Sequence, residues 1–205
     1  LYEAAHIMGI SVRLGIKFKA RFHDRYVEFL WTPKGFTDTK SVLDFLKEPE
    51  SEALMQEGRA VEDWAREEVL QTLKVFNAKH ATEISKEWGI EVPPLSEKEF
   101  DDYVGMGQTT LIRLSEFVHS KLLPLVEAEA ERVRQELKNA SAEDQDVLQE
   151  RLKKLDELTS VVLYQRWLRP SRNPEIPSLS EPADDGRPNL LKIDVQGLLS
   201  RLMHI

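Results

Sequence analysis

The sequence predicts a mainly α-helical protein with one β-hairpin near its start. Three observations lead to this prediction: strict apolar–polar alternation over residues 10–22, apolar residues every three or four positions after Thr39, and a proline-rich stretch from Pro170. Alternation is the period of a strand, and three-to-four spacing is that of an amphipathic helix. We therefore expect a long antiparallel helical hairpin or bundle, with an N-terminal β-hairpin as a minor β component and an extended Pro-rich C-terminal segment.

The first predicted element is the β-hairpin. Every even position from Ile10 to Phe22 is apolar, and in a strand these side chains share one face. The stretch His23-Asp24-Arg25 predicts a turn, and Tyr26–Trp31 predicts the return strand. Because an isolated hairpin is marginal in water, its apolar face must dock on the helices or on another chain. The opposite face would carry four basic side chains: Arg13, Lys17, Lys19 and Arg21.

Two helices are expected in the next section. The first spans Thr39–Lys47 and ends before Pro49. Ser51 is then expected to cap a long helix that runs to about Trp88. Gly89 follows at the position where a left-handed C-terminal cap usually lies.

The middle of the chain predicts a connector and a helix interrupted by proline. The stretch Val92-Pro93-Pro94-Leu95 is typical of a stiff extended connector, and Ser96 with Glu99 forms the pattern of a capping box. A helix is expected over Gln108–Leu137. Pro124 lies inside it, so we expect a kink or a break there.

A second long helix is expected to follow after a short turn. Lys138-Asn139-Ala140-Ser141 predicts this turn, with Ser141 capping the helix. So short a connection predicts an antiparallel helical hairpin. The apolar positions of the second helix follow the 4-3 spacing of a heptad seam: Leu148, Leu152, Leu155, Thr159 and Val162.

The end of the chain has a different composition. Residues 170–188 are rich in proline and polar residues, which predicts an extended or disordered linker. The segment Leu190–Ile205 has helical spacing. It is expected either to dock in a groove of a partner or, equally well, to fold back on its own bundle. The residues that carry this expectation are Leu191, Val195, Leu198, Leu199 and Leu202.

These patterns divide the chain into four segments. They are a β-hairpin segment with a basic face (1–35), a helical bundle or hairpin domain (36–169), a Pro-rich linker (170–189) and a short amphipathic helix (190–205). The formal charge of −8 is uneven, because residues 1–35 carry a net +3 while residues 36–100 carry −7. An acidic body disfavours general nucleic-acid binding, and the basic hairpin face is the exception.

Several motifs are candidates for chemical sites. Glu3/His6 and Glu116/His119 have the i, i+3 spacing of carboxylate–histidine metal sites in helical bundles, but the order of elements around them does not fit such a bundle. His80 is expected to be a hydrogen-bonded core histidine, and His23 with Asp24 a solvated turn. The glycine pair around Met106 lacks a P-loop lysine. Asn139 starts a glycosylation motif, but turn and capping chemistry is its expected role.

The sequence also sets limits on function. There is no cysteine, which excludes disulfides, thiolate zinc sites and cysteine nucleophiles. No apolar run approaches the length of a transmembrane segment. The chain begins at Leu1 rather than methionine, so we expect residues upstream of it, and the compartment stays undetermined. Because nothing else indicates secretion, an intracellular location is expected.

We therefore expect a non-enzymatic structural or adaptor subunit of a larger protein assembly, without metal or cofactor. Its partners would be protein subunits, contacted through the helices and the hairpin. One alternative is a ribonucleoprotein subunit whose basic hairpin contacts RNA phosphates, and an anionic membrane surface is another target for the same face. A second alternative is a helical-bundle enzyme with a carboxylate–histidine metal site.

Overall fold

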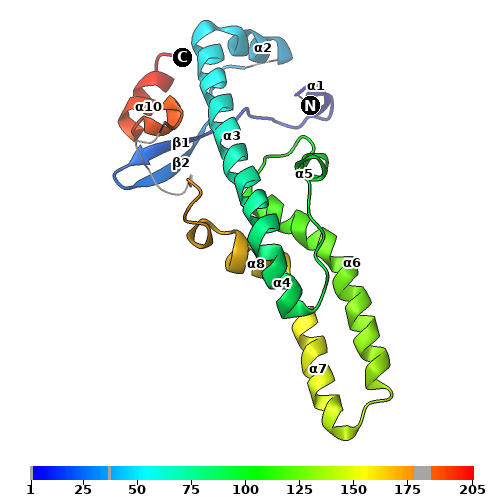
Figure 1. Cartoon of the computed structure of the whole chain (residues 1–205). Helices are drawn as coiled ribbons and strands as arrows, with labels where there is room; N and C mark the ends of the chain where they lie inside the picture. The colour runs from blue at the N-terminus through cyan, green and yellow to red at the C-terminus, as the bar shows by residue number, and fades with distance from the viewer. Residues whose placement is uncertain (1, 37, 178–185) are drawn as a thin grey trace. The chain divides into compact units, whose positions relative to one another are not determined.

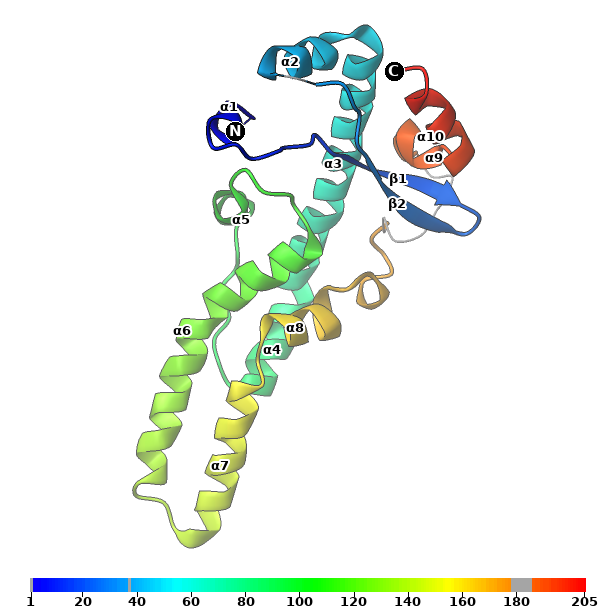
Figure 2. The same cartoon turned by 180° about the vertical axis from the view of Figure 1, so that it is seen from behind.

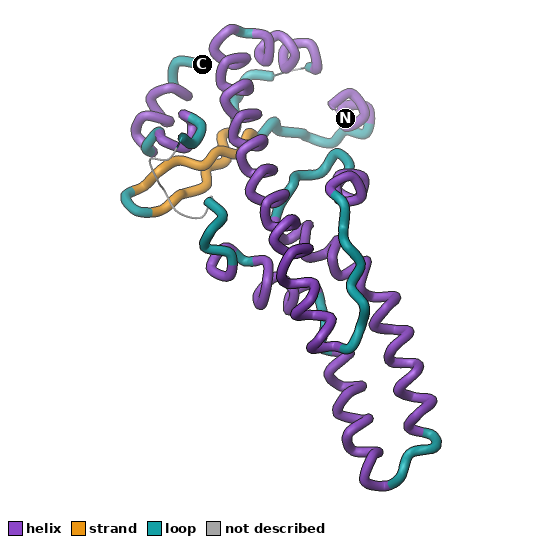
Figure 3. The backbone as a smooth tube through the Cα atoms, in the orientation of Figure 1, coloured by secondary structure: helices purple, strands orange, loops and turns teal. Residues whose placement is uncertain are grey.

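The computed structural model describes residues 2–36, 38–177 and 186–205. The fold is mainly α-helical, and the strands drawn in Figure 3 form one two-stranded antiparallel sheet near the start, which confirms the predicted fold class. The described residues form two compact units. We call residues 2–36, 38–64 and 186–205 the hairpin unit, and residues 65–177 the helical unit. This division differs from the four predicted segments, because the end of the chain belongs to the hairpin unit.

The sheet consists of β1 (Ile16–Phe22) and β2 (Arg25–Trp31), with Phe22 opposite Arg25 and Ile16 opposite Trp31. The predicted first strand was therefore too long, because residues 10–15 are irregular. The reason lies in the partner strand. Thr32-Pro33 follows Trp31, and proline has no N–H to donate to a ladder. Residues before Ile16 consequently have no partner in β2.

The turn and the start of the chain complete this region. His23 has a φ of 56°. A positive φ at this position is what the primed turns of two-residue hairpins require. The short helix α1 (Tyr2–Ile7) precedes the hairpin and was not predicted, because six residues are too few for a helical period to be recognised.

Helix α2 (Thr39–Lys47) has the predicted bounds. Its cap is Asp38, whose side chain accepts from the amide of Ser41 at 2.8 Å. The prediction that Ser51 caps the next helix was wrong, because α3 (Pro49–Val75) begins two residues earlier. Proline is favoured in the first helical turn since its φ is already helical. Ser51 is instead buried, and its hydroxyl has no hydrogen-bond partner among the described residues.

The helix continues to Trp88 as predicted. After Val75 it passes through one π-helical turn, η1 (Phe76–His80), and then becomes α4 (Ala81–Trp88). Gly89 ends it in the left-handed conformation, with a φ of 67°, which confirms the predicted cap.

Replacing Gly89 with alanine should destabilise the helical unit by about 1–2 kcal/mol, since a side chain resists the left-handed conformation. The added Cβ would also lie 2.7 Å from Nη2 of Arg151, a side chain that would have to shift. Gly58→Ala is the matched control, because Gly58 lies in α3 and the Cβ that alanine adds there would have nothing within 4 Å. Urea denaturation should show that Gly58→Ala stabilises by up to about 1 kcal/mol, and equal effects of the two changes would contradict the prediction.

Helix α5 (Glu97–Val104) starts with the predicted capping box of Ser96 and Glu99. The connector before it is held by Asn77, whose side-chain amide donates to the carbonyl of Leu95 at 2.8 Å and accepts from its amide at 2.9 Å. The backbone groups of Leu95, at the end of this extended stretch, are therefore satisfied by the neighbouring π-helical turn.

Helices α6 (Leu111–Leu137) and α7 (Ala142–Asp156) form the predicted antiparallel hairpin, which Figure 2 shows side by side. Helix α6 starts three residues later than predicted, capped by Thr110, and it continues through Pro124 without a break. Ser141 caps α7 as predicted.

The predicted heptad seam ends early. Helix α7 stops at Asp156, and Thr159 is the cap of a new short helix, α8 (Ser160–Leu163). The hydroxyl of Thr159 accepts from the amide of Val162 at 3.3 Å. A threonine placed on an apolar stripe can thus begin a helix instead of continuing a seam.

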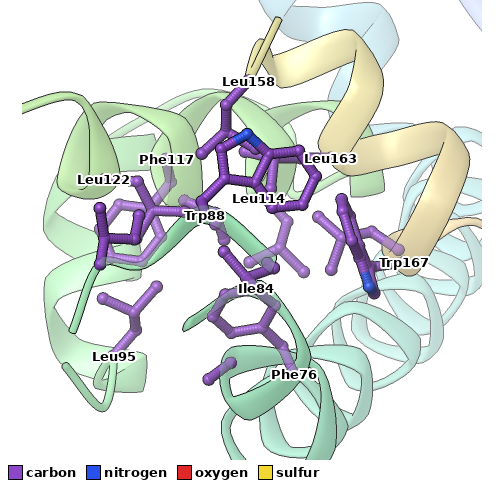
Figure 4. Close-up of a cluster of buried hydrophobic side chains, with 14 of the residues drawn as sticks. Phe76, Ile84, Trp88, Leu95, Leu114, Phe117, Leu122, Leu158, Leu163 and Trp167 are labelled. Atoms are coloured by element: carbon purple, nitrogen blue, oxygen red, sulfur yellow. The ribbon is translucent and has the colours of Figure 1, made fainter. Parts of the chain in front are cut away.

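The core of the helical unit gathers side chains from α4, α6, α8 and the second π-helical turn, η2 (Tyr164–Leu168) (Figure 4). Trp88 and Trp167 meet edge to face, with ring centroids 5.4 Å apart. The most completely buried core residues include Phe76, Ile84, Leu114, Phe117 and Leu163.

The prediction of an unstructured linker from residue 170 was wrong for its first part. Residues Pro170–Arg172 form a 3₁₀ turn, η3, and both Asn173 and Ile176 are buried in the helical unit. Composition misled here because Pro170 occupies a first helical position, where proline is favoured. Residues 178–185 of the predicted linker lie outside the described residues.

Candidate interaction surface

The C-terminal segment packs on the β-hairpin. It forms α9 (Asn189–Lys192) and α10 (Val195–Leu202), which lie beside β1 and β2 in both Figure 1 and Figure 2. The apolar face of the sheet is covered in this way, together with Leu54 of α3. The residues buried in this cluster are Phe18, Ala20, Leu54, Leu190, Leu198 and Leu202.

This packing decides between the two alternatives for the C-terminal segment. Leu191, Leu198 and Leu202 are at most 9% exposed, so they serve contacts within the chain and not the groove of a partner. Val195 is half-buried against the same cluster, whereas Leu199 is 47% exposed. The segment therefore folds back on its own chain. It packs on the hairpin and α3, whereas the expected surface was the helical bundle.

Polar contacts fix the position of the segment. The backbone amide of Arg21 donates to the carbonyl of Ile193 at 3.0 Å, and the Tyr26 hydroxyl donates to the carbonyl of Leu191 at 3.1 Å. Arg201 of α10 donates from both terminal nitrogens to Glu57 of α3, at 2.8 and 2.9 Å. Such a two-bonded pair sets orientation as well as distance.

The contact of Arg201 with Glu57 should make the docking of α10 sensitive to acid. The hydrogen bonds from Arg201 hold the pKa of Glu57 below its usual 4.5. A lowered folded-state pKa means that the stabilisation is present above pH 4.5 and is lost as the pH falls through the lower value. Because both side chains are about one-third exposed, we expect a loss of only about 1 kcal/mol. Glu57→Gln should remove this pH dependence. Amide exchange at Arg21, measured between pH 6 and about pH 3, follows the docking of the segment. If the variant keeps the pH dependence, the Glu57–Arg201 pair is not its cause.

The other face of the sheet carries the predicted basic residues, with one exception. Lys17 and Lys19 lie on β1 and are exposed, but Arg13 lies in the irregular segment before the strand and does not share this face. Arg21 is half-buried, and its Nε donates to the carbonyl of His23 at 3.2 Å. The predicted row of four basic side chains is therefore reduced to two outward lysines with Arg21 beside them.

An acidic residue of the partner strand partly neutralises the two lysines. Glu28 lies opposite Lys19, and its carboxylate is 2.7 Å from Nζ of Lys17 and 3.8 Å from Nζ of Lys19. The hydrogen bond from Lys17, with the charges of both lysines, lowers the pKa of Glu28. One positive charge of the three-residue group stays unbalanced, so the face keeps a net cationic character.

Residues of β2 on this face were missed by the sequence analysis. Tyr26, Glu28 and Leu30 lie opposite Arg21, Lys19 and Lys17. Leu30 is 71% exposed. The signal was available, because a two-residue turn at His23-Asp24 sets this register directly. We call Lys17, Lys19, Tyr26, Glu28 and Leu30 the outer hairpin face.

Glu116 and His119, one of the two candidate metal pairs, have different surroundings. Glu116 forms an ion pair with Arg113 at 2.9 Å, and His119 lines a cavity of about 300 Å³ between α6 and the end of α7. Within residues 2–36, 38–177 and 186–205, no group of three or more histidine, aspartate or glutamate side chains could hold a metal ion. His23 lies exposed in the hairpin turn, edge-on to the ring of Phe22.

His80 is a buried histidine within a hydrogen-bonded network, as expected. Its Nε2 is 2.9 Å from Oδ1 of Asn173, and its Nδ1 is 3.3 Å from Oε2 of Glu83. The Trp167 indole also donates to Glu83, at 3.0 Å. Partial burial opposes the ionised form of Glu83, but the bonds from His80 and Trp167 keep its pKa below the usual value. The network joins both π-helical turns to η3.

The remaining motifs lie at the ends of helices. Gly105 ends α5 with a φ of 56°. Thr110 caps α6, and its hydroxyl accepts from the amide of Arg113 at 3.1 Å. Asn139 is exposed in the turn between α6 and α7.

Comparison with protein-family models, curated proteins and solved structures gave no match. Across the described parts of the chain, no helix has both the length and the apolar character needed to cross a bilayer.

Proposed function

We propose that this chain is a non-enzymatic subunit or adaptor of a protein assembly, and that the outer hairpin face is a contact surface for a partner protein. The observation that supports this is the position of Leu30. It is 71% exposed and lies opposite Lys17, on a face whose two lysines share a single glutamate. Leu30 thus adds apolar contact area to a face that also offers a partner one unbalanced positive charge.

The packing of the C-terminal segment supports the same proposal. The apolar face of the sheet is already buried by α9, α10 and Leu54, so the hairpin does not need its outer face for its own stability. RNA is a less favourable partner. Glu28 stands between the two lysines, and a carboxylate at this place repels phosphate groups.

A charge-swap variant tests the proposal. Lys17→Glu, Lys19→Glu and Glu28→Lys together preserve opposite charges across the strands but change the group from net positive to net negative. We expect the amount of protein that co-purifies with the full chain from its own cells to fall at least about tenfold, because like charges then meet across the interface. Lys40→Glu, at an exposed site of α2, changes the net charge by the same two units, and this matched control should retain the co-purifying proteins.

Two results would overturn the proposal. One is an equal set of bound proteins for the charge swap and the α2 control. The other is binding that ribonuclease abolishes and that falls steeply with salt, which would support the ribonucleoprotein alternative. A circular-dichroism melt of each variant shows that the fold is retained.

A further inference from the structure

We infer that the partner adds a strand to the outer edge of β2, and that this strand is an extended segment of another protein with an acidic side chain on its outward side. The inference rests on the proposed function and specifies how the partner is held. It follows from the hydrogen-bond pattern of the hairpin, the exposure of the edge and the charge beside it.

The hydrogen-bond pattern identifies the unpaired groups. In an antiparallel pair, opposite residues alternate between pairs that bond to each other and pairs whose N–H and C=O groups point away. The amide of Arg21 donates outward to Ile193, so Arg21 and its partner Tyr26 form a pair of the second kind. By alternation, Glu28 and Leu30 also direct their backbone groups away from β1.

These outward groups of β2 have no backbone partner in the described chain. The outer edge of β1 is bonded to Ile193, whereas no backbone hydrogen bond joins Tyr26, Glu28 or Leu30 to another described residue outside the hairpin. Three donors and three acceptors therefore face outward in a row. The ligand that satisfies such a row is another extended backbone.

The side chains specify the chemistry of the added strand. On the outer face it would lie beside Tyr26, Glu28 and Leu30, where Lys17 and Lys19 leave one positive charge unbalanced. A carboxylate opposite Glu28 balances this charge, because the two lysines then serve two carboxylates. On the other face the added strand continues the row of Val27, Phe29 and Trp31, which calls for apolar side chains.

The same charges disfavour a second copy of this chain. Pairing β2 with β2 around Glu28 would bring together two groups that each carry two lysines and one glutamate. Two net positive groups at the spacing of neighbouring strands repel each other. A different, acidic segment fits the edge better than this chain does.

The experiment uses the ¹⁵N-labelled full chain and a capped heptapeptide probe, Val-Thr-Val-Glu-Val-Thr-Val. Its valines would lie on the inner side and its glutamate on the outer side. We expect the probe to slow amide exchange at Tyr26, Glu28 and Leu30. A probe with lysine in place of glutamate should bind at least about fivefold more weakly.

Two variants at one position separate the edge from the side chain. Leu30→Pro removes an outward N–H without removing a bond to β1, while Leu30→Ala removes the side chain alone. We expect Leu30→Pro to weaken binding about tenfold relative to Leu30→Ala. Equal affinities of the two variants, or no binding at about 1 mM probe, would overturn the inference.

Other occupants give distinct outcomes that also overturn it. A dimer that Leu30→Pro dissociates identifies a second copy, and protection of these amides by oligouridine identifies RNA. If the charge swap releases the co-purifying proteins but Leu30→Pro retains them, the outer hairpin face still binds a partner, and only strand addition is wrong.

Discussion

Replacing Asn173 with alanine should lower the free energy of unfolding of the helical unit by about 3 kcal/mol, because buried polar groups left without partners cost about 1–3 kcal/mol each. Asn173 is 1% exposed. Its Nδ2 donates to the carbonyls of Trp167 and Arg169, at 2.7 and 3.3 Å, while its Oδ1 faces Nε2 of His80. Alanine would leave the carbonyl of Trp167 and Nε2 of His80 without this partner, while the carbonyl of Arg169 keeps its bond from the amide of Arg172.

Urea denaturation followed by tryptophan fluorescence measures this loss. The control is Asn139→Ala in the exposed turn between α6 and α7, which should change stability by less than about 0.5 kcal/mol. A double-mutant cycle with His80→Ala should show coupling of about 1 kcal/mol or more, since the two side chains share a bond. Independent effects of the two changes would mean that the network does not hold residues 170–177 in place.

Leu198→Ala should release the C-terminal segment from the hairpin at a cost of about 3 kcal/mol, the usual range for a buried leucine. Leu198 is 1% exposed, whereas its neighbour Leu199 is 47% exposed, so Leu199→Ala is a matched control with an expected loss below about 1 kcal/mol. Both residues belong to the predicted apolar stripe, and their different burial separates packing within the chain from availability to a partner.

Amide exchange at Arg21 reports on this docking, because its N–H donates to Ile193. A local loss of about 3 kcal/mol corresponds to roughly 100-fold faster exchange in Leu198→Ala. Similar exchange rates in the two variants would contradict the observed packing. Leu198 would then again be a candidate for contact with another protein.

Local signals explain why much of the helical structure was predictable. The capping box of Ser96 and Glu99, the cap at Ser141 and the left-handed Gly89 depend on contacts within a few residues. The same holds for the short turn that makes α6 and α7 antiparallel. Such features are encoded by neighbouring side chains, so they could be predicted without knowledge of the rest of the fold.

Predictions failed where a distant segment supplied the deciding contact. The alternation before Ile16 resembles a strand, but a strand requires a partner, and β2 ends before Pro33. Residues 170–177 have the composition of a linker, yet Asn173 is held by His80, which lies 93 positions earlier. Local composition cannot contain either contact.

Only the β1 part of the outer hairpin face could be predicted, because the rest depends on pairing with β2. Alternation correctly placed Lys17 and Lys19 on one face, because the period of a strand is a property of the backbone. Pairing with β2 then placed Glu28 between them and Leu30 beside them. A sequence read one strand at a time shows a basic face, whereas the paired strands show a mixed face with one unbalanced charge.

Residue spacing and local capping patterns establish most of the long helices, the caps at Gly89, Ser96 and Ser141, and which residues of β1 share a face. They leave open what covers each face. Only the folded structure shows that α9 and α10 dock on the hairpin and that the outer edge of β2 is free in the described chain. The docking depends on contacts between residues far apart in the sequence, such as Tyr26 and Leu191, which are 165 positions apart. These contacts depend on burial and hydrogen bonding in the assembled fold, which no local pattern encodes.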